Sequence, residues 1–529
     1  MVCLLPLLFT MPRNYSVFFS VLLPMMISCW SVAYAQDTIT YQVGILGGMS
    51  TQRYQPHWST ANRFGILDDT EGRVSLLSVR AATKHRFSSR WSIALGIEGV
   101  GKVSSQPNDL WLQQAYVALR YAAFELSGGR VEETIGSQHP TLSSGSLGVS
   151  GNARPIPRIM LAIPTYTDVP FTRGYVQVKG NYVHGWLGKE RYVANAYLHE
   201  KSVYARAGGK LPVNLYGGLV HFAIWGGETS TVKIPSQFKD YLRIITGSSA
   251  IADGPNDPLI GEAANAAGDH LGFYDLGAHV SLQNFAVQVY QQTPFEDASG
   301  NNPFNGDRLL GVSITTKHSA IITGFLYEYL HTTYQSGPGL TDPANRDWYD
   351  LGPNYGYRYG GRDNYYDNYL YKTGWVYQDR IIGTPLFFTK SRAKRYIEGF
   401  ADPDERGFDF NVVNNRVIAH HVGIEGNVSS VQYRLLGTFT RNYGTYGGIN
   451  GGITRWGSIE NPELEYAFKP ARRQAYFMLE VTTHPFSSQW SLLTSLAWDT
   501  GQLTDNAGFL VGLRREGLFT LRRNQPGQP

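Results

Sequence analysis

The sequence predicts an all-β protein, a transmembrane antiparallel β-barrel of roughly 16–20 strands with long outer loops that partly fill its lumen or mouth. Three observations support this fold class: a secretory signal, segments in which apolar side chains alternate with small or polar ones, and links that alternate between short and long. Successive side chains of a strand point to opposite faces, so such a strand separates lipid from a wet lumen.

The first 35 residues are expected to be a signal peptide. Arg13 supplies a positive charge, residues 17–27 form an apolar run, and Ala33-Tyr34-Ala35 offers a small-x-small cleavage site before Gln36. A lipoprotein signal with its modified residue at Cys29 is the alternative. Cleavage near Ala35 leads to the expectation that the mature protein resides in the outer membrane of a Gram-negative bacterium.

Composition narrows the classes of function. The two cysteines, Cys3 and Cys29, precede the expected cleavage site, which excludes disulfides and cysteine chemistry from the mature chain. The formal net charge of only +4 gives no reason to expect a nucleic-acid partner. No apolar run of roughly 18 residues follows the signal, so only a closed barrel could span a membrane. The 34 Tyr, 25 Phe and 11 Trp suit interfacial girdles and sugar-binding surfaces.

Alternating segments recur from residue 73 to residue 521, which is the expected barrel domain. The clearest lies near the end, where Trp490, Leu492, Leu496 and Trp498 share one face and a second strand ends on Phe519. Residues 36–72 are expected to lead into the barrel or to lie inside it, and residues 522–529 form a tail. The other candidate strands are 90–102, 110–121, 124–131, 174–186, 203–208, 215–225, 272–283, 285–291, 309–316, 320–331, 371–380, 412–427, 430–443 and 475–484.

The links between these segments differ in length, as they do in outer-membrane barrels. Short links at 87–90 and 486–489 are expected on the periplasmic side. The long links are 132–152, 226–270, 335–368 and 444–470. We expect the long links to fold over the outer mouth or into the lumen, where function would then lie. A soluble two-sheet protein is the alternative, but strands of eleven or more residues exceed the usual soluble length of about 5–6.

An aromatic tract in the third long link is the densest candidate site. Flat rings stack on sugars, while carboxylates, amides and guanidinium groups bind hydroxyls or acidic substituents. The candidate carbohydrate-binding residues are Trp348, Tyr355, Tyr357, Tyr359, Arg362, Asp363, Tyr365 and Tyr366. A packed loop is an equally open interpretation for residues 348–366, and residues 369–377 are expected to be girdle residues at the start of a strand.

A second group of polar residues is predicted to form a lumen network. It comprises His184, His199, Glu200 and Lys201. His199-Glu200-Lys201 could also provide acid–base chemistry, but a lone triplet is more often a hydrogen-bond network. His420 and His421 are neighbours in a strand and therefore face opposite sides, so they cannot bind one metal together. Zinc-type spacing, a phosphate-binding glycine loop and a nucleophile elbow are absent from the sequence, so no enzyme activity, cofactor or metal is expected.

Ordered sequence strings carry a family resemblance over nearly all of the mature chain. They are residues 56–65 (PHWSTANRFG), 142–147 (LSSGSL), 152–158 (NARPIPR), 179–180 (KG), 184–186 (HGW), 197–201 (YLHEK), 218–221 (GLVH), 225–227 (WGG), 363–366 (DNYY) and 383–386 (GTPL). In this order they resemble motifs of the Wzi-type capsule assembly family. One difference is that the best-known members begin with a periplasmic helical bundle, for which residues 36–67 are too short and too strand-like.

The resemblance implies an outer-membrane barrel of about 18 strands that binds exported capsular or other surface polysaccharide and organises its assembly or attachment at the cell surface. It implies a lectin-like, non-enzymatic role. The expected partners are this polysaccharide, outer-membrane lipid and, during biogenesis, the barrel-insertion machinery. A porin-like or glycan-export channel is the alternative, with an outer-membrane enzyme that uses His199 or Glu200 as a third.

Overall fold

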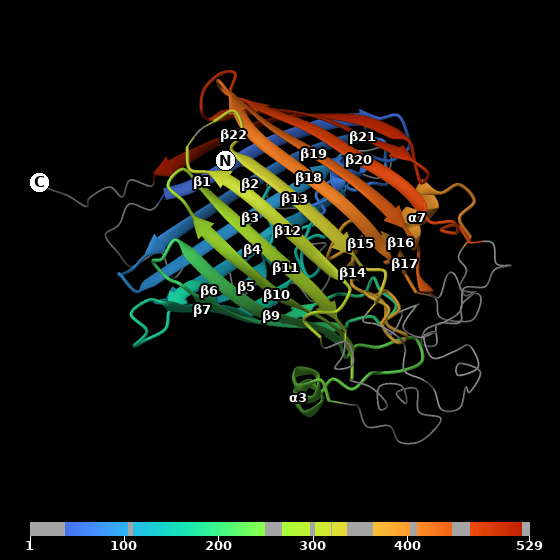
Figure 1. Ribbon diagram of the computed structural model, residues 1–529, viewed down its shortest axis with the longest axis horizontal. Helices are drawn as coiled ribbons and strands as arrows, with labels where there is room; N and C mark the ends of the chain where they lie inside the picture. Colours follow the sequence, from blue (N-terminus) through green and yellow to red (C-terminus); the bar gives the residue numbers. More distant parts are fainter. Residues whose placement is uncertain are drawn as a thin grey trace, which may run out of the picture.

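The computed structural model describes residues 38–520, apart from 104–108, 249–266, 297–301, 319, 336–362, 402–409 and 447–465. Eighteen strands form one antiparallel sheet, and the first strand of the chain pairs with both the second and the last, which closes the barrel. This confirms the predicted fold class. Figure 1 shows the tilted strands of the wall and, toward one end, α7 and the short strands β14–β17.

The wall strands are 7–15 residues long. They are β1 Thr38–Ser50, β2 Arg73–Arg86, β3 Trp91–Lys102, β4 Asp109–Tyr121, β5 Phe124–Arg130, β6 Arg158–Asp168, β7 Val176–Trp186, β8 Tyr197–Ala207, β9 Val213–Trp225, β10 Asp269–Ser281, β11 Phe285–Phe295, β12 Arg308–Thr316, β13 Gly324–His331, β18 Val417–Val428, β19 Val431–Asn442, β20 Arg472–Thr483, β21 Trp490–Gly501 and β22 Asn506–Thr520. Among the described helices, none is long and apolar enough to cross a membrane.

Links between the wall strands separate by length. Because neighbouring strands are antiparallel, every second link emerges at the same end of the barrel. Short links such as 122–123, 208–212 and 429–430 share one end. The long links 131–157, 226–268, 332–416 and 443–471 share the other, as the sequence predicted. We therefore call the second end the outer mouth.

The outward face of the wall is apolar, as the alternation in β21 predicted. Leu496 and Trp498 face outward and are 49% and 44% exposed, whereas Asp499 faces the lumen and is only 3% exposed. At the short-link end Trp91 and Tyr121 pack with ring centroids 4.6 Å apart, and both remain exposed. Paired aromatic rings at the border of an apolar band are typical of an interfacial girdle.

The wall differs from the prediction in three places. It begins at β1, so the expected start at residue 73 is too late. Glycines interrupt the apolar alternation of β1, and a Cβ at Gly48 would lie 2.3 Å from the carbonyl oxygen of Phe509. The sequence also missed β6, whose register shifts between Ile163 and Thr167. Residues 371–380 are not a wall strand, because only the two-residue strand β14 (Val376–Tyr377) forms there, paired with β15 (Arg380–Ile381).

A plug occupies the lumen. It comprises the described parts of residues 51–72, 131–157 and 363–416, and it contains α2 (His57–Thr60), β14, β15, α7 (Lys390–Tyr396) and the pair β16 (Phe388–Thr389) with β17 (Val412–Asn414). Its buried apolar side chains form one hydrophobic core with inward-facing residues of the wall. The prediction was that the long links fold over the outer mouth or into the lumen. Links 131–157 and 332–416 enter the lumen, and Ile234, Tyr466 and Phe468 of the other two links join the same core.

Candidate functional site

The plug is fixed to the wall first by its N-terminal part. The backbone N–H of His57 donates to the carboxylate of Asp499 on β21 at 2.9 Å. Trp58 Nε1 donates to Thr438 Oγ1 on β19 at 3.1 Å. All four residues of α2 are buried. The string PHWSTANRFG is thus a lumen segment that binds three neighbouring strands, since Arg63 Nη2 also donates to Glu480 of β20 at 2.5 Å.

The link 131–157 anchors the plug to a second part of the wall, where β13 is separated from β19 only by β18. Ser143 Oγ and Ser144 Oγ donate to the two carboxylate oxygens of Glu328 on β13, each at 2.6 Å. The backbone N–H of Leu147 donates to Gln292 of β11 at 2.9 Å. The string LSSGSL therefore has a structural role, because its first two serine hydroxyls fix the plug to a buried carboxylate of the wall.

The described part of the third long link completes the plug. Trp375 packs on Phe222 of β9, with ring centroids 4.9 Å apart, and its Nε1 donates to the carbonyl oxygen of Gly148 at 2.8 Å. The plug therefore touches β9, β11, β13, β19, β20 and β21, which form one half of the ring. It also reaches the other half, where Lys102 of β3 donates to Asp68 at 2.7 Å and Gln113 of β4 donates to the carbonyl oxygen of Phe64 at 3.0 Å.

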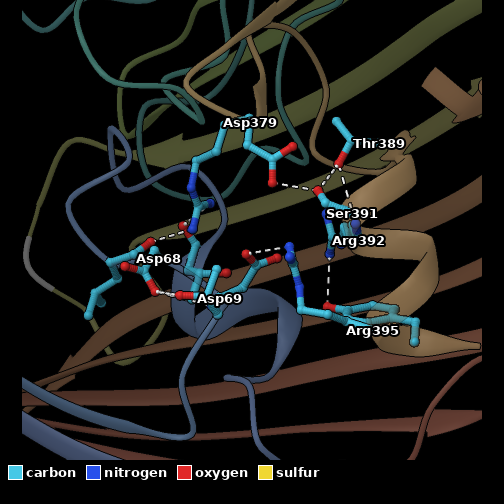
Figure 2. Close-up of polar contacts among 12 residues, drawn as sticks. Asp68, Asp69, Asp379, Thr389, Ser391, Arg392 and Arg395 are labelled. Atoms are coloured by element: carbon cyan, nitrogen blue, oxygen red, sulfur yellow. Dashed lines mark hydrogen bonds and ion pairs between the residues drawn. The ribbon is translucent and has the colours of Figure 1, made fainter. Parts of the chain in front are cut away.

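An arginine cluster holds the parts of the plug together (Figure 2). Arg395 pairs with Asp69 at 2.8 Å, and Arg380 donates to the carbonyl oxygen of Leu67. Arg392 of α7 donates to Tyr396 OH at 3.1 Å and to Nδ1 of His57 at 2.5 Å. Arg380, Arg392 and Arg395 thus bind residues of the N-terminal part of the plug, at Leu67, His57 and Asp69.

The charge state of Asp69 follows from this cluster. Burial favours the protonated carboxyl, but Arg380, Arg395 and Arg392 more than offset it and hold the pKa of Asp69 below its usual 3.8. Asp69 is therefore a carboxylate at neutral pH, and it balances part of the positive charge buried around it.

His57 is expected to make the protein less stable in mild acid. Burial, and then the charge of Arg392, lowers the pKa of His57 well below 6.5, so the imidazole is neutral in the fold. Below about pH 6.5, His57 is protonated in the unfolded chain but not in the folded chain. Protonation therefore favours unfolding, and the free energy of unfolding decreases as pH falls. Urea unfolding midpoints at several pH values should decline less for His57→Asn than for wild type. Parallel declines would contradict this assignment.

A cavity of about 70 Å³ lies between α2, the link 131–157 and the inner face of β19 and β20. Its lining includes Trp58, Asn62, Gln138, His139 and Arg434. A space of this size holds a few water molecules.

The predicted carbohydrate-binding residues divide into two groups. Trp348, Tyr355, Tyr357, Tyr359 and Arg362 lie outside the described residues. Asp363, Tyr365 and Tyr366 belong to the plug. Tyr365 donates its hydroxyl to Asp307 at 2.9 Å and Tyr366 donates to the carbonyl oxygen of Leu147. Their rings are 1% and 3% exposed, so neither offers a face for stacking on a sugar.

The prediction that residues 369–377 form part of a girdle is also wrong. Tyr371, Trp375 and Tyr377 are buried inside the barrel rather than exposed on its rim. A girdle and a plug both need large amphipathic rings, so composition could not separate them.

The predicted lumen network is wrong for three of its four members. Glu200 faces the lumen, where it accepts a hydrogen bond from Asn181. His199 and Lys201 point outward, to Tyr241 OH at 3.1 Å and to the carbonyl oxygen of Ile245, both on α3 (Phe238–Thr246). His184 also faces outward, beside Trp186. The reason is the two-residue period, which places Glu200 opposite to both its neighbours.

The structure confirms the prediction that His420 and His421 face opposite sides of their strand. His421 faces the lumen, where Nε2 donates to the carbonyl oxygen of Leu142 at 2.6 Å. His420 faces outward, 2.8 Å from Tyr327 OH. Across the described parts of the chain, no group of three or more His, Cys, Asp or Glu residues is placed to hold a metal ion.

The structure also places pairs of aromatic and cationic residues at the outer mouth that the sequence pattern did not predict. Arg416 stacks on Tyr446, with 3.9 Å between the guanidinium carbon and the ring centroid, and Arg441 lies 5.1 Å from the ring of Tyr443. Lys372 lies 5.0 Å from the ring of Tyr192, which is half exposed. Basic residues near Tyr could have signalled this mouth, but of these three pairs only Arg441 and Tyr443 are close in sequence.

A closed, lipid-facing wall around a filled lumen defines a plugged β-barrel of the bacterial outer membrane. Residues 57–389 match the family model described as capsule assembly protein Wzi. The chain belongs to the Wzi capsule assembly family, as its ordered strings predicted.

One solved structure with a TM-score above 0.5 shares the fold, and two further solved barrels show weaker similarity. Wzi of Escherichia coli, described as an outer-membrane protein involved in group 1 capsule assembly and a carbohydrate-binding β-barrel, is 15% identical, with a TM-score of 0.53 over 94% of this chain and 87% of that chain. OccK5 of Pseudomonas aeruginosa is 7% identical, with a TM-score of 0.45 over 91% and 98% of the two chains. OccAB2 of Acinetobacter baumannii is 8% identical, also with a TM-score of 0.45 over 91% and 98%. No curated protein matches the chain.

Proposed function

We propose that this barrel binds exported capsular or other surface polysaccharide at its outer mouth and organises the assembly or attachment of that polysaccharide at the cell surface. Family membership supports this role, and the solved E. coli Wzi is described as carbohydrate-binding. The structural observation that carries the proposal is the plug, which fills the lumen while the long links gather at one end. A filled barrel favours binding over conduction.

The proposed action is binding without catalysis. Ser143 and Ser144 are donors to Glu328, and Glu200 faces away from His199, so neither group forms a catalytic arrangement. We also propose that the signal is cleaved near Ala35 and that the barrel-insertion machinery places the mature chain in the outer membrane.

The glycan is proposed to contact the aromatic tract together with the described residues of the mouth. Rings of Trp348, Tyr355, Tyr357 and Tyr359 would stack on sugar faces. Arg362 would bind hydroxyls or acidic substituents, as would Arg416 and Lys372 of the mouth. Arg416 and Lys372 already lie beside tyrosine rings, which places a cation next to an aromatic ring at two points.

Changing the tract should weaken retention of the glycan. If each stacking contact is worth about 0.5–1.5 kcal/mol, the triple change Tyr355→Ala, Tyr357→Ala and Tyr359→Ala should reduce affinity about tenfold or more. The measurement is the amount of capsular polysaccharide bound by purified, folded barrel. Phe171→Ala is the matched control, because Phe171 is a fully exposed aromatic residue in a link at the periplasmic end. Equal retention by the triple variant and wild type would reject the assigned tract.

A further inference from the structure

A short helix lies outside the barrel. α3, in the long link between β9 and β10, is seen in Figure 1 below the wall at β9. The ring of Tyr241 stacks on Trp225 of β9, with centroids 5.0 Å apart and planes inclined by 27°. Its hydroxyl lies 3.1 Å from His199 of β8 and donates to Tyr182 of β7 at 2.9 Å. The helix is therefore seated on outward-facing side chains of three wall strands.

The position of α3 along the wall corresponds to the outer border of the apolar band. Lys201 Nζ donates to the carbonyl oxygen of Ile245 in the last turn of the helix. Farther from the mouth on the same face, Val203, Leu219 and Leu215 are 59%, 39% and 60% exposed, as lipid-facing residues should be. The helix thus lies where lipid headgroups of the outer leaflet meet the acyl chains.

The side of α3 that faces away from the wall combines apolar and positive residues. Phe238 and Leu242 are 74% and 48% exposed and lie one turn apart. Lys239 on the helix and Lys233 just before it are exposed, and among the described residues neither pairs with an acid. Arg243 is different, since it pairs with Asp240 at 3.0 Å. Exposed rings and aliphatic chains beside free lysines are typical of helices that lie in a membrane interface.

We propose that α3 and the link before it form a docking site for a phosphorylated glycolipid of the outer leaflet. Lys233 and Lys239 pair with the phosphates, and the acyl chains run along Phe238 and Leu242 toward Val203. Charge complementarity selects this occupant, because a zwitterionic phospholipid brings no net negative charge to the two lysines. The site is separate from the outer mouth and does not depend on polysaccharide binding.

Native mass spectrometry of the purified barrel in detergent, with lipid A, phosphatidylglycerol or phosphatidylcholine added, tests the proposal. Wild type should retain lipid A about tenfold or more over phosphatidylcholine, and Lys233→Glu with Lys239→Glu should remove this preference. Phe238→Ser with Leu242→Ser should also lower lipid A retention. Lys210→Glu is the control, because Lys210 is an exposed lysine in the periplasmic link between β8 and β9.

Two results would overturn the assignment. Lipid A retention that is unchanged in the double-lysine variant would remove the phosphate contacts. Equal retention of lipid A and phosphatidylglycerol by wild type would rule out a glycolipid headgroup as the preferred ligand. Heat-dependent mobility on gels confirms that each variant is folded, so a failure to bind cannot be mistaken for a failure to fold.

Discussion

Replacing Asp69 by asparagine is expected to lower the free energy of unfolding by about 3–5 kcal/mol, because it leaves buried arginines without their counter-charge. Asp69 pairs with Arg395 at 2.8 Å, and Arg380 and Arg392 also act on its carboxylate. An asparagine of the same shape keeps the packing but carries no charge. The change therefore isolates the electrostatic contribution of this residue to the joint between α7 and the N-terminal segment.

Urea unfolding of the purified barrel in micelles measures this loss. Asp168→Asn is the matched control, because Asp168 is an exposed carboxylate near the periplasmic end and should change stability by less than about 0.5 kcal/mol. The pKa of Asp69 is lowered in the fold, so its contribution is present above about pH 3.8 and is lost as pH falls through the lower folded value. The stabilities of Asp69→Asn and wild type should thus converge in strong acid. A variant as stable as wild type at neutral pH would contradict this account.

The wall was largely predictable because a barrel strand is a local pattern. In β21 each residue shows by its own polarity which solvent it meets, and Trp498 and Asp499 lie on the predicted faces. β1 and β6 departed from the pattern for reasons that are not local. Gly48 is small because Phe509 of β22 approaches it, and β6 shifts register against β7. Both reasons lie in partner strands, which one sequence segment does not show.

The plug was much less predictable because its contacts join residues far apart in the chain. Arg395 meets Asp69, and Ser143 meets Glu328, with no short-range spacing to mark either pair. Aromatic density marked the third long link as unusual. It could not show that Tyr365 and Trp375 fill the lumen, because a buried ring and a sugar-binding ring have the same composition.

The two-residue period of a strand explains why the predicted grouping of His199, Glu200 and Lys201 is wrong. His199, Glu200 and Lys201 were grouped because they are adjacent, but adjacency in a strand separates side chains. Applied to this triplet, as it was to His420 and His421, the two-residue period would have predicted that Glu200 faces the lumen alone. It could not have predicted α3, since a helix of nine residues on an outer wall has no counterpart in the strand pattern.

Removing the third long link is expected to turn a closed barrel into a channel. Residues 334–414 contribute Tyr365, Trp375 and α7 to the plug, and without them an 18-stranded wall should enclose an aqueous pore. β13 and β18 are paired antiparallel neighbours, so a short Gly/Ser linker can join them without disturbing the wall. In planar bilayers wild type should pass little current, and this deletion should raise the conductance about tenfold or more.

A matched deletion separates loss of the plug from loss of any long link. β9 and β10 are also paired antiparallel neighbours, and their link carries α3 outside the wall. Replacing residues 236–266 by the same linker keeps Ile234, which belongs to the core, and should therefore leave the conductance near the wild-type level. If wild type already conducts steadily, or if both deletions conduct equally, the plug does not close the barrel. Either result would favour a porin-like or glycan-export channel over a binding protein.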